Sequence, residues 1–194
     1  MRRIKVSNLQ ARRFIPLLGF GLLSLLLFRG LSLDPTALPA ARLGQSFPDF
    51  AKLELQSGEA IGVANLSQRP ALVNVWATWC YSCRVEHPFL LELAEAGIPI
   101  YGLNYKDDAE KARAWLGQLG DPYALNIVDA EGSLGLDLGV YGAPETYVID
   151  QEGRIVHRHV GILDAEVFSA DFSAWFPQGP LGVGTPAREE SVAE

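Results

Sequence analysis

The chain has 194 residues, 48% of them hydrophobic, which is typical of one globular domain with extensions. Its net charge is −7, and six of its 16 basic residues lie within the first 29 positions, so ten remain against all 23 acidic residues. This acidic body argues against nucleic-acid binding, which needs a basic surface.

The N-terminal region combines positive charge with a long apolar stretch. Residues 14–28 are uncharged and strongly apolar, and basic residues precede them. This pattern is shared by cleaved signal peptides and by membrane anchors. No clean cleavage site of small residues follows, whereas extension to Leu33, with Arg29 reaching the interface, gives the roughly 20 residues that span a bilayer. We therefore favour an uncleaved anchor over residues 14–33.

The charge pattern also orients the chain. Basic residues in the segment 1–13 place the N-terminus in the cytoplasm and the body outside the inner membrane. In a Gram-negative cell the body would then lie in the periplasm, where thiols tend to be oxidised. Residues 34–43 are rich in Pro and Ala and are expected to form a linker, followed by the folded domain over 44–176 and a flexible tail over 177–194.

Within the domain, strand and helix patterns alternate and a hairpin follows. The expected elements are a hairpin of residues 50–55 and 60–63, a buried strand over 71–76, a helix over 80–96, a strand over 98–105, a helix over 109–119 capped by Asp107 or Asp108, a strand over 125–128, a short helix over 133–138, hairpin strands over 147–149 and 155–160, and a closing helix over 165–176. This order predicts an α/β fold with a mixed central sheet flanked by helices.

Both cysteines of the chain, Cys80 and Cys83, fall where the buried strand passes into the first long helix. Unpaired N–H groups and the positive end of the helix dipole favour a thiolate there over a thiol. The second cysteine lies one turn later, within disulfide reach. Because a bridge closing so short a loop stabilises a fold little, the pair is expected to be reactive.

Three chemistries use the Cys-x-x-Cys spacing. Covalent haem attachment needs a His directly after the second cysteine, and Arg84 stands there. A zinc site needs four ligands and would have to recruit His87, His157 and His159, which we expect to be structural. A redox dithiol is the interpretation that remains, and it requires neither a metal nor a cofactor.

Two further segments sharpen this interpretation into a family resemblance. The stretch Trp76-Ala77-Thr78-Trp79-Cys80-x-x-Cys83 resembles the active site of thioredoxin-like proteins. Residues 139–146, Gly-Val-Tyr-Gly-Ala-Pro-Glu-Thr, resemble the signature of the DsbE/CcmG family, the membrane-anchored thiol:disulfide interchange proteins of cytochrome c maturation. Residues 104–108 and 134–139 are also similar to that family, and the resemblance extends from Leu43 to Trp175. It implies a thioredoxin-like fold.

The resemblance implies roles for the central residues. Cys80 would be the exposed nucleophile and Cys83 the buried resolving thiol of a redox-active disulfide. Pro144 would be a cis-proline facing the disulfide, leaving the backbone of Ala143 free to pair with an extended substrate. Trp79 and Tyr141 would shape the substrate-binding face. Many family members have Pro after the first cysteine, but Tyr81 stands here, so the family's redox potential does not carry over.

Acidic residues near the dithiol are a further family feature. Glu86 follows Cys83 on the helix and Glu145 follows Pro144. Either carboxylate would raise a cysteine pKa or act as a base toward Cys83. For Glu86 the alternative is an ordinary solvated charge, and Asp129 is a weaker candidate for another acid beneath the site.

The resemblance also implies the direction of the chemistry. The chain would reduce disulfides of apocytochrome c, or of a thiol protein that handles it, and a membrane thiol-disulfide electron transporter would re-reduce the chain. One alternative is an anchored thioredoxin-like reductase of another pathway. Another is a redox-silent module that binds peptides beside Pro144. The motif alone does not set the direction, because Cys-x-x-Cys proteins oxidise, reduce or isomerise.

Overall fold

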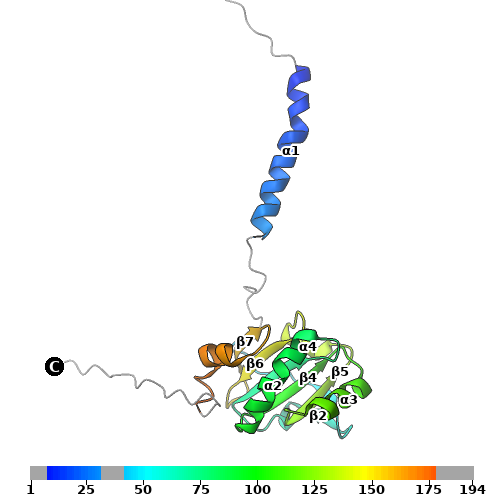
Figure 1. Ribbon diagram of the computed structural model, residues 1–194, viewed down its shortest axis with the longest axis vertical. Coiled ribbons are helices and arrows are strands. Elements are labelled where there is room, and N and C mark those ends of the chain that lie inside the picture. Colours follow the sequence, from blue (N-terminus) through cyan, green and yellow to red (C-terminus); the bar gives the residue numbers. More distant parts are fainter. Residues whose placement is uncertain (1–7, 32–41, 178–194) are drawn as a thin grey trace, which may run out of the picture. The chain divides into compact units, whose positions relative to one another are not determined.

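Strand β3 (Ala71–Trp76) lies inside the sheet, and all six of its residues are buried. The computed structural model describes residues 8–31 and 42–177, and the sheet belongs to the second of these ranges (Figure 1). The sequence of β3 is continuously apolar apart from Asn74 because both faces of the strand are covered. Its bounds are those that the sequence predicts.

The sheet has seven strands in the order β2-β1-β5-β4-β3-β6-β7. The remaining strands are β1 (Ala51–Glu54), β2 (Ala60–Gly62), β4 (Ile100–Tyr105), β5 (Leu125–Asp129), β6 (Glu145–Ile149) and β7 (Ile155–Val160). Strand β4 runs parallel to β3 and β5, whereas the pairs β1–β2, β1–β5, β3–β6 and β6–β7 are antiparallel. The predicted mixed sheet and both predicted hairpins are confirmed.

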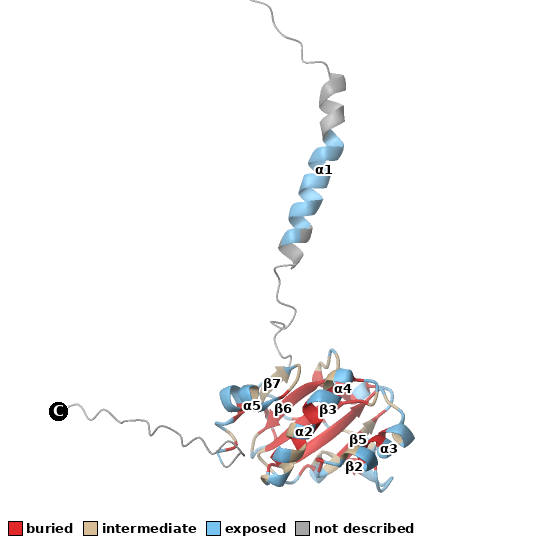
Figure 2. Cartoon of the chain, viewed as in Figure 1, coloured by how far each residue is buried: buried red, intermediate tan, exposed pale blue. Residues whose placement is uncertain are grey.

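Side chains of β3 alternate between two cores. Leu72 and Trp76 enter the core formed with helices α2 (Tyr81–Glu95) and α3 (Ala109–Leu119), whereas Val73 and Val75 enter the core formed with α4 (Ser133–Leu138). The helices therefore cover both faces of the sheet. Figure 2 shows the result: buried strands in the middle, and helices whose outer surfaces are exposed.

The C-terminal element differs from the expected α-helix over 165–176. A single α-helical turn, α5 (Ala165–Val167), passes directly into a π-helical turn, η3 (Phe168–Phe172). In this wider turn the rings of Phe168 and Phe172 stack at 5.9 Å and both are buried. Phe172 also packs edge-on against the ring of His157 on β7, at 4.8 Å. These aromatic contacts occur in a π-helical turn, which the periodicity of an α-helix does not predict.

The N-terminal part of the chain forms a separate unit over residues 1–39. It contains helix α1 (Asn8–Leu31), which has Pro16 inside it. Within residues 8–31 and 42–177, no helix combines the length and the hydropathy needed to cross a membrane. The predicted anchor over 14–33 is not tested further by the fold. Most of the expected linker and nearly all of the expected tail lie outside the described residues.

Candidate active site

The two cysteines form a disulfide at the N-terminus of α2. Cys80 is the N-cap residue, and its Sγ accepts a hydrogen bond of 3.0 Å from the backbone N–H of Cys83. The Cα atoms of the pair are 5.3 Å apart. Because the same N–H lies at the positive end of the helix, it would also stabilise a Cys80 thiolate after reduction.

The expectation of an exposed Cys80 needs correction. Cys80 is 7% exposed and Cys83 is 2% exposed, so the first sulfur is only slightly more accessible than the second. Both cysteines belong to the core cluster that contains Trp76 and Ala77. The surface beside them is instead aromatic, because Trp79 and Tyr81 are 56% and 80% exposed.

The loop before β6 provides the second half of the site. The Ala143–Pro144 peptide bond is cis, and Pro144 is buried. Ala143 packs against the core cluster that holds both cysteines. The carbonyl of Pro144 accepts a hydrogen bond of 3.0 Å from Gly161, whereas the main chain of Ala143 forms none within the described part of the chain. An extended peptide could therefore pair with Ala143.

Glu145 is completely buried and its carboxylate has several donors. Oε1 accepts hydrogen bonds from the backbone N–H groups of Tyr141 and Gly142, at 2.8 and 3.4 Å. Oε2 accepts from the hydroxyl of Tyr147 at 2.8 Å and forms an ion pair of 2.9 Å with Arg158. The guanidinium of Arg158 also lies over the exposed ring of Tyr141. These contacts hold the loop that carries Pro144.

Glu86 is buried as well, at 1% exposure, so it is not a solvated charge of the helix surface. Its Oε1 accepts from Asn74 Nδ2 at 2.9 Å, and its Oε2 accepts from the backbone N–H of Leu163 at 2.8 Å. Burial raises the pKa of Glu86 to about 7, and the two hydrogen bonds only partly offset this rise. Glu86 follows Cys83 by one helical turn on the buried side of α2, so the two side chains are neighbours.

The loop after β4 also contacts the segment that leads into the dithiol. The carboxylate of Asp107 accepts hydrogen bonds from both the backbone N–H and the hydroxyl of Thr78, two residues before Cys80. The sequence pattern treats Asp107 only as a possible cap of α3, but Asp108 is the N-cap residue. Contact between residues 78 and 107 depends on the parallel pairing of β3 with β4, which local periodicity does not reveal.

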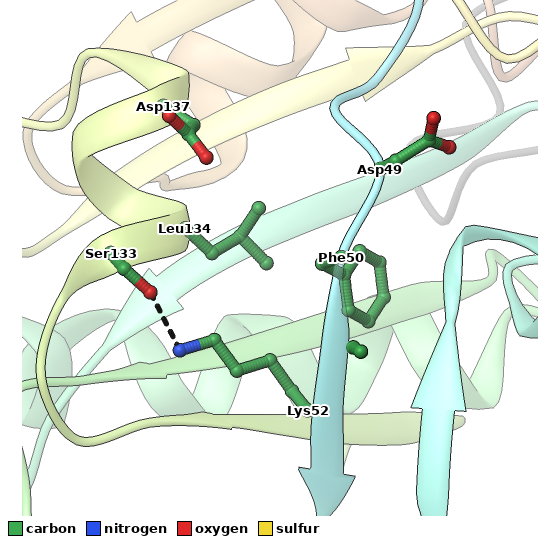
Figure 3. A pocket seen from close by; sticks show the side chains of 7 residues that line it. Asp49, Phe50, Lys52, Ser133, Leu134 and Asp137 are labelled. Atoms are coloured by element: carbon green, nitrogen blue, oxygen red, sulfur yellow. Dashed lines mark hydrogen bonds between the residues drawn. The ribbon is translucent and has the colours of Figure 1, made fainter.

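Asp129 is engaged at α4 and β1. Its buried carboxylate accepts from the backbone N–H of Gly135 at 2.8 Å and pairs with Lys52 at 2.8 Å. Figure 3 shows Lys52 pointing toward Ser133 across a surface pocket between β1 and α4, whose lining includes neither cysteine nor Pro144. The carboxylate of Asp129 therefore contacts α4 and β1.

The buried histidine of α2 has structural contacts. His87 lies 3.0 Å from the carbonyl oxygen of Gly120 through Nε2, and its ring meets Trp115 edge-on at 4.4 Å. Within residues 8–31 and 42–177, no cluster of three or more His, Cys, Asp or Glu residues is arranged to hold a metal ion.

Comparison with known proteins identifies relatives of the whole domain. The family model described as Redoxin matches residues 42–173. The thiol:disulfide interchange protein DsbE of Pseudomonas aeruginosa is 52% identical over 165 residues, which are 84% of this chain and 92% of the relative. DsbE of Escherichia coli K12 is 49% identical over 140 residues, which are 71% of this chain and 76% of the relative.

Solved structures agree on the fold. A putative thiol:disulfide interchange protein DsbE from Chlorobium tepidum is 22% identical with a TM-score of 0.57, covering 69% of this chain and 96% of that structure. A thio-disulfide isomerase from Thermus thermophilus is 26% identical with a TM-score of 0.56, covering 67% and 94%. The predicted thioredoxin-like fold is confirmed.

Proposed function

This chain belongs to the DsbE family of thiol:disulfide interchange proteins, and from that premise we propose that it reduces disulfides of apocytochrome c, or of a protein that handles it, before haem attachment. One observation carries the chemistry: the Cys80–Cys83 disulfide lies at the N-terminus of α2, in one core cluster with Ala143 of the cis-proline loop. The direction of electron flow comes from the family resemblance.

We propose that Cys80 attacks and Cys83 resolves. The Cys80 thiolate forms a bond to one sulfur of the client disulfide, and the other client sulfur departs with the electron pair and takes up a proton. Cys83 then attacks Cys80 Sγ, so that the internal disulfide forms and the second client sulfur leaves as a thiol. Two electrons and two protons pass to the client. A membrane thiol-disulfide electron transporter would return the chain to its dithiol form.

We assign the two glutamates different roles. Glu86, with a pKa of about 7, is suited to take the proton of Cys83 during resolution. The carboxylate of Glu145 already binds Arg158, Tyr147 and two backbone N–H groups. These contacts support a role for Glu145 in positioning the Pro144 loop, and not in proton transfer. Trp79, Tyr141 and Ala143 would form the face that binds the client. Two of them are exposed aromatics, and the main chain of the third forms no hydrogen bond with any residue in 8–31 and 42–177.

We further propose that residues 14–33 anchor the chain in the inner membrane, with 1–13 in the cytoplasm, a linker over 34–43, the domain over 44–176 in the periplasm and a tail over 177–194. The basic residues before the apolar stretch support this orientation. Large apolar side chains of α1, such as Leu18 and Phe20, are exposed. Extraction of membranes at alkaline pH tests the anchor: an anchored chain stays with the pellet, and release into the wash would contradict the proposal.

The function is tested by genetic complementation. In a strain lacking this protein, the wild-type chain should restore c-type cytochromes, whereas the C80S/C83S double variant should not unless a small thiol is added. Normal cytochrome maturation with the double variant would favour the alternative of a peptide-binding module. Normal cytochromes in the deletion strain would favour a reductase of another pathway. A reduction potential near that of strongly oxidising exported proteins would contradict the proposed direction.

A further inference from the structure

The carboxylate of Asp107, which lies just after β4, accepts four hydrogen bonds. Oδ2 accepts from the backbone N–H of Thr78 at 2.6 Å and from Asn104 Nδ2 at 2.9 Å. Oδ1 accepts from the hydroxyl of Thr78 at 2.7 Å and from the backbone N–H of Asp108 at 2.9 Å. Two of these four donors belong to a single residue of the loop that leads into Cys80.

The amide of Asn104 is oriented by this carboxylate. Its Nδ2 faces Asp107, and its buried Oδ1 has no hydrogen-bond partner among the described residues. A buried unpaired acceptor costs stability, about 1–3 kcal/mol in general. A flipped amide would instead point its oxygen at the carboxylate of Asp107, which repels it. The fold therefore tolerates an unpaired acceptor at a position that supports Asp107.

The same loop also holds the exposed aromatic residue beside the dithiol. Trp79 Nε1 donates a hydrogen bond of 3.0 Å to the carbonyl of Lys106. Lys106 has a φ of +49°, and it is the sole non-glycine residue with positive φ in the ranges 8–31 and 42–177. Non-glycine residues seldom adopt this conformation, and it persists where the surroundings enforce it. Here the N–H of Lys106 is bound to the carbonyl of Asp129 at 2.9 Å.

We propose that Asp107 is a positioning residue for the dithiol: through Thr78 it fixes the approach of the chain to Cys80, and its loop fixes the ring of Trp79. The proposal rests on the proposed function, because it assigns a further residue to the same thiol exchange. Asp107 acts through Thr78 and does not need to touch the client. The loop over 106–108 thus couples the end of β4 to the orientation of the attacking sulfur.

A carboxylate suits this position and an amide does not. The surrounding groups are three N–H donors and one hydroxyl, so all four contacts can be met only by a group that accepts at both ends. In Asp107→Asn, whichever way the amide is turned, its NH2 group faces at least one N–H donor. Burial acts to raise the pKa of Asp107, but the hydrogen bonds from Thr78, Asn104 and Asp108 outweigh it and hold the pKa below its usual value.

The test compares neighbouring aspartates in the reduced full-length protein, with reduction of a disulfide-containing peptide as the assay. Asp107→Asn should lower the second-order rate constant of peptide reduction by about tenfold or more, because small misplacements of reacting atoms are costly. Asp108→Asn is the matched control: an Asn at the N-cap of α3 can still accept from the N–H groups of Glu110 and Lys111, so this variant should stay within about twofold in rate. All rates are compared at a temperature where every variant is fully folded.

A second pair of variants separates geometry from charge. Removal of a negative charge near Cys80 would by itself favour the thiolate, so Asp107→Asn changes two things. Thr78→Val keeps the charge and removes one donor, and it should also lower the second-order rate constant about tenfold, whereas Thr78→Ser keeps the hydroxyl and should remain within about twofold. A silent Thr78→Val variant would overturn the proposal.

Amide hydrogen exchange provides a readout that does not depend on activity. Exchange of the Thr78 amide should accelerate in Asp107→Asn but not in Asp108→Asn. If the wild-type chain reduces the peptide and Asp107→Asn matches Asp108→Asn in both rate and Thr78 exchange, the inference fails. If the wild-type chain does not reduce the peptide, the proposed function fails, and the exchange data still decide whether Asp107 holds Thr78.

Discussion

Asn74 of β3 donates a hydrogen bond of 2.9 Å to Glu86 of α2, and neither residue is more than 1% exposed. The same amide group donates to Thr146 at 3.1 Å, and its oxygen accepts from the hydroxyl of Tyr123 at 2.9 Å. This buried polar network connects the active-site helix to β3, β6 and the segment before β5. It keeps a carboxyl group with a pKa of about 7 within one helical turn of Cys83.

Glu86→Gln should flatten the dependence of stability on pH. Burial raises the pKa of Glu86 from 4.5 to about 7, so the folded chain holds a proton that the unfolded chain releases in this interval. The associated stability is fully present below about pH 4.5 and is lost as pH rises to about 7, up to roughly 3 kcal/mol. Urea denaturation of the oxidised protein across this range measures the loss, which Glu86→Gln should lack.

The matched control for this change is Glu92→Gln, an exposed carboxylate of the same helix. This variant should retain the wild-type slope of stability against pH. Equal slopes in wild type and Glu86→Gln would show that Glu86 does not titrate in this range.

Cys83→Ala should trap the reaction at its midpoint. Without a resolving thiol, the mixed disulfide between Cys80 and the client cannot be displaced from within, and it should accumulate. Non-reducing gel electrophoresis with an oxidised peptide measures the adduct, and Cys80→Ala should form far less of it. More adduct with Cys80→Ala than with Cys83→Ala would reverse the assigned roles of the two cysteines.

Arg158→Ala should destabilise the chain strongly. Its guanidinium pairs with the fully buried carboxylate of Glu145 at 2.9 Å, and the arginine side chain is only 6% exposed. Removal of one partner leaves an uncompensated buried charge, at a typical cost of about 3–5 kcal/mol. Thermal or urea unfolding measures the change.

Arg154→Ala is the control for this pair, because Arg154 is 53% exposed and pairs with Asp150 at the surface. Such a surface pair contributes about 0–1 kcal/mol. A comparable loss of stability in both variants would mean that the buried Glu145–Arg158 pair contributes no more to stability than an exposed ion pair does.

Substitutions of two glycines should change the stability of the protein in opposite directions. A Cβ at Gly102 of β4 would lie 2.0 Å from Asn126 Oδ1 and 2.9 Å from Trp76 Nε1, so Gly102→Ala should break the hydrogen bond between those two side chains. Overpacking of this kind costs about 1–3 kcal/mol. At Gly117, inside α3, a Cβ meets nothing within 4 Å, and Gly117→Ala should stabilise by roughly 0.5–1 kcal/mol. The midpoints of urea denaturation measure both changes in stability. A Gly102→Ala variant more stable than wild type would contradict the packing described around Trp76.

Much of the fold follows from the sequence alone. The continuous apolar run of β3 indicates a strand covered on both faces, and helical periodicity predicts α3 and α4 with their observed bounds. The C-terminal element is where periodicity fails, because stacking of Phe168 on Phe172 accompanies a π-helical turn. Local sequence patterns indicate which face of a helix or strand is buried. This information is sufficient to predict that helices cover both faces of the sheet.

By itself the sequence determined the chemistry of the site: two thiols, Cys80 and Cys83, at the start of a helix, and a loop signature around Pro144. Only the tertiary structure decided the surroundings of these residues. Burial makes Glu86 a titrating group near pH 7, Arg158 occupies Glu145, and Asp107 holds Thr78. Each of these contacts joins residues on different elements, and their meeting depends on the order and register of strands β3 to β7, for which no local pattern carries a signal.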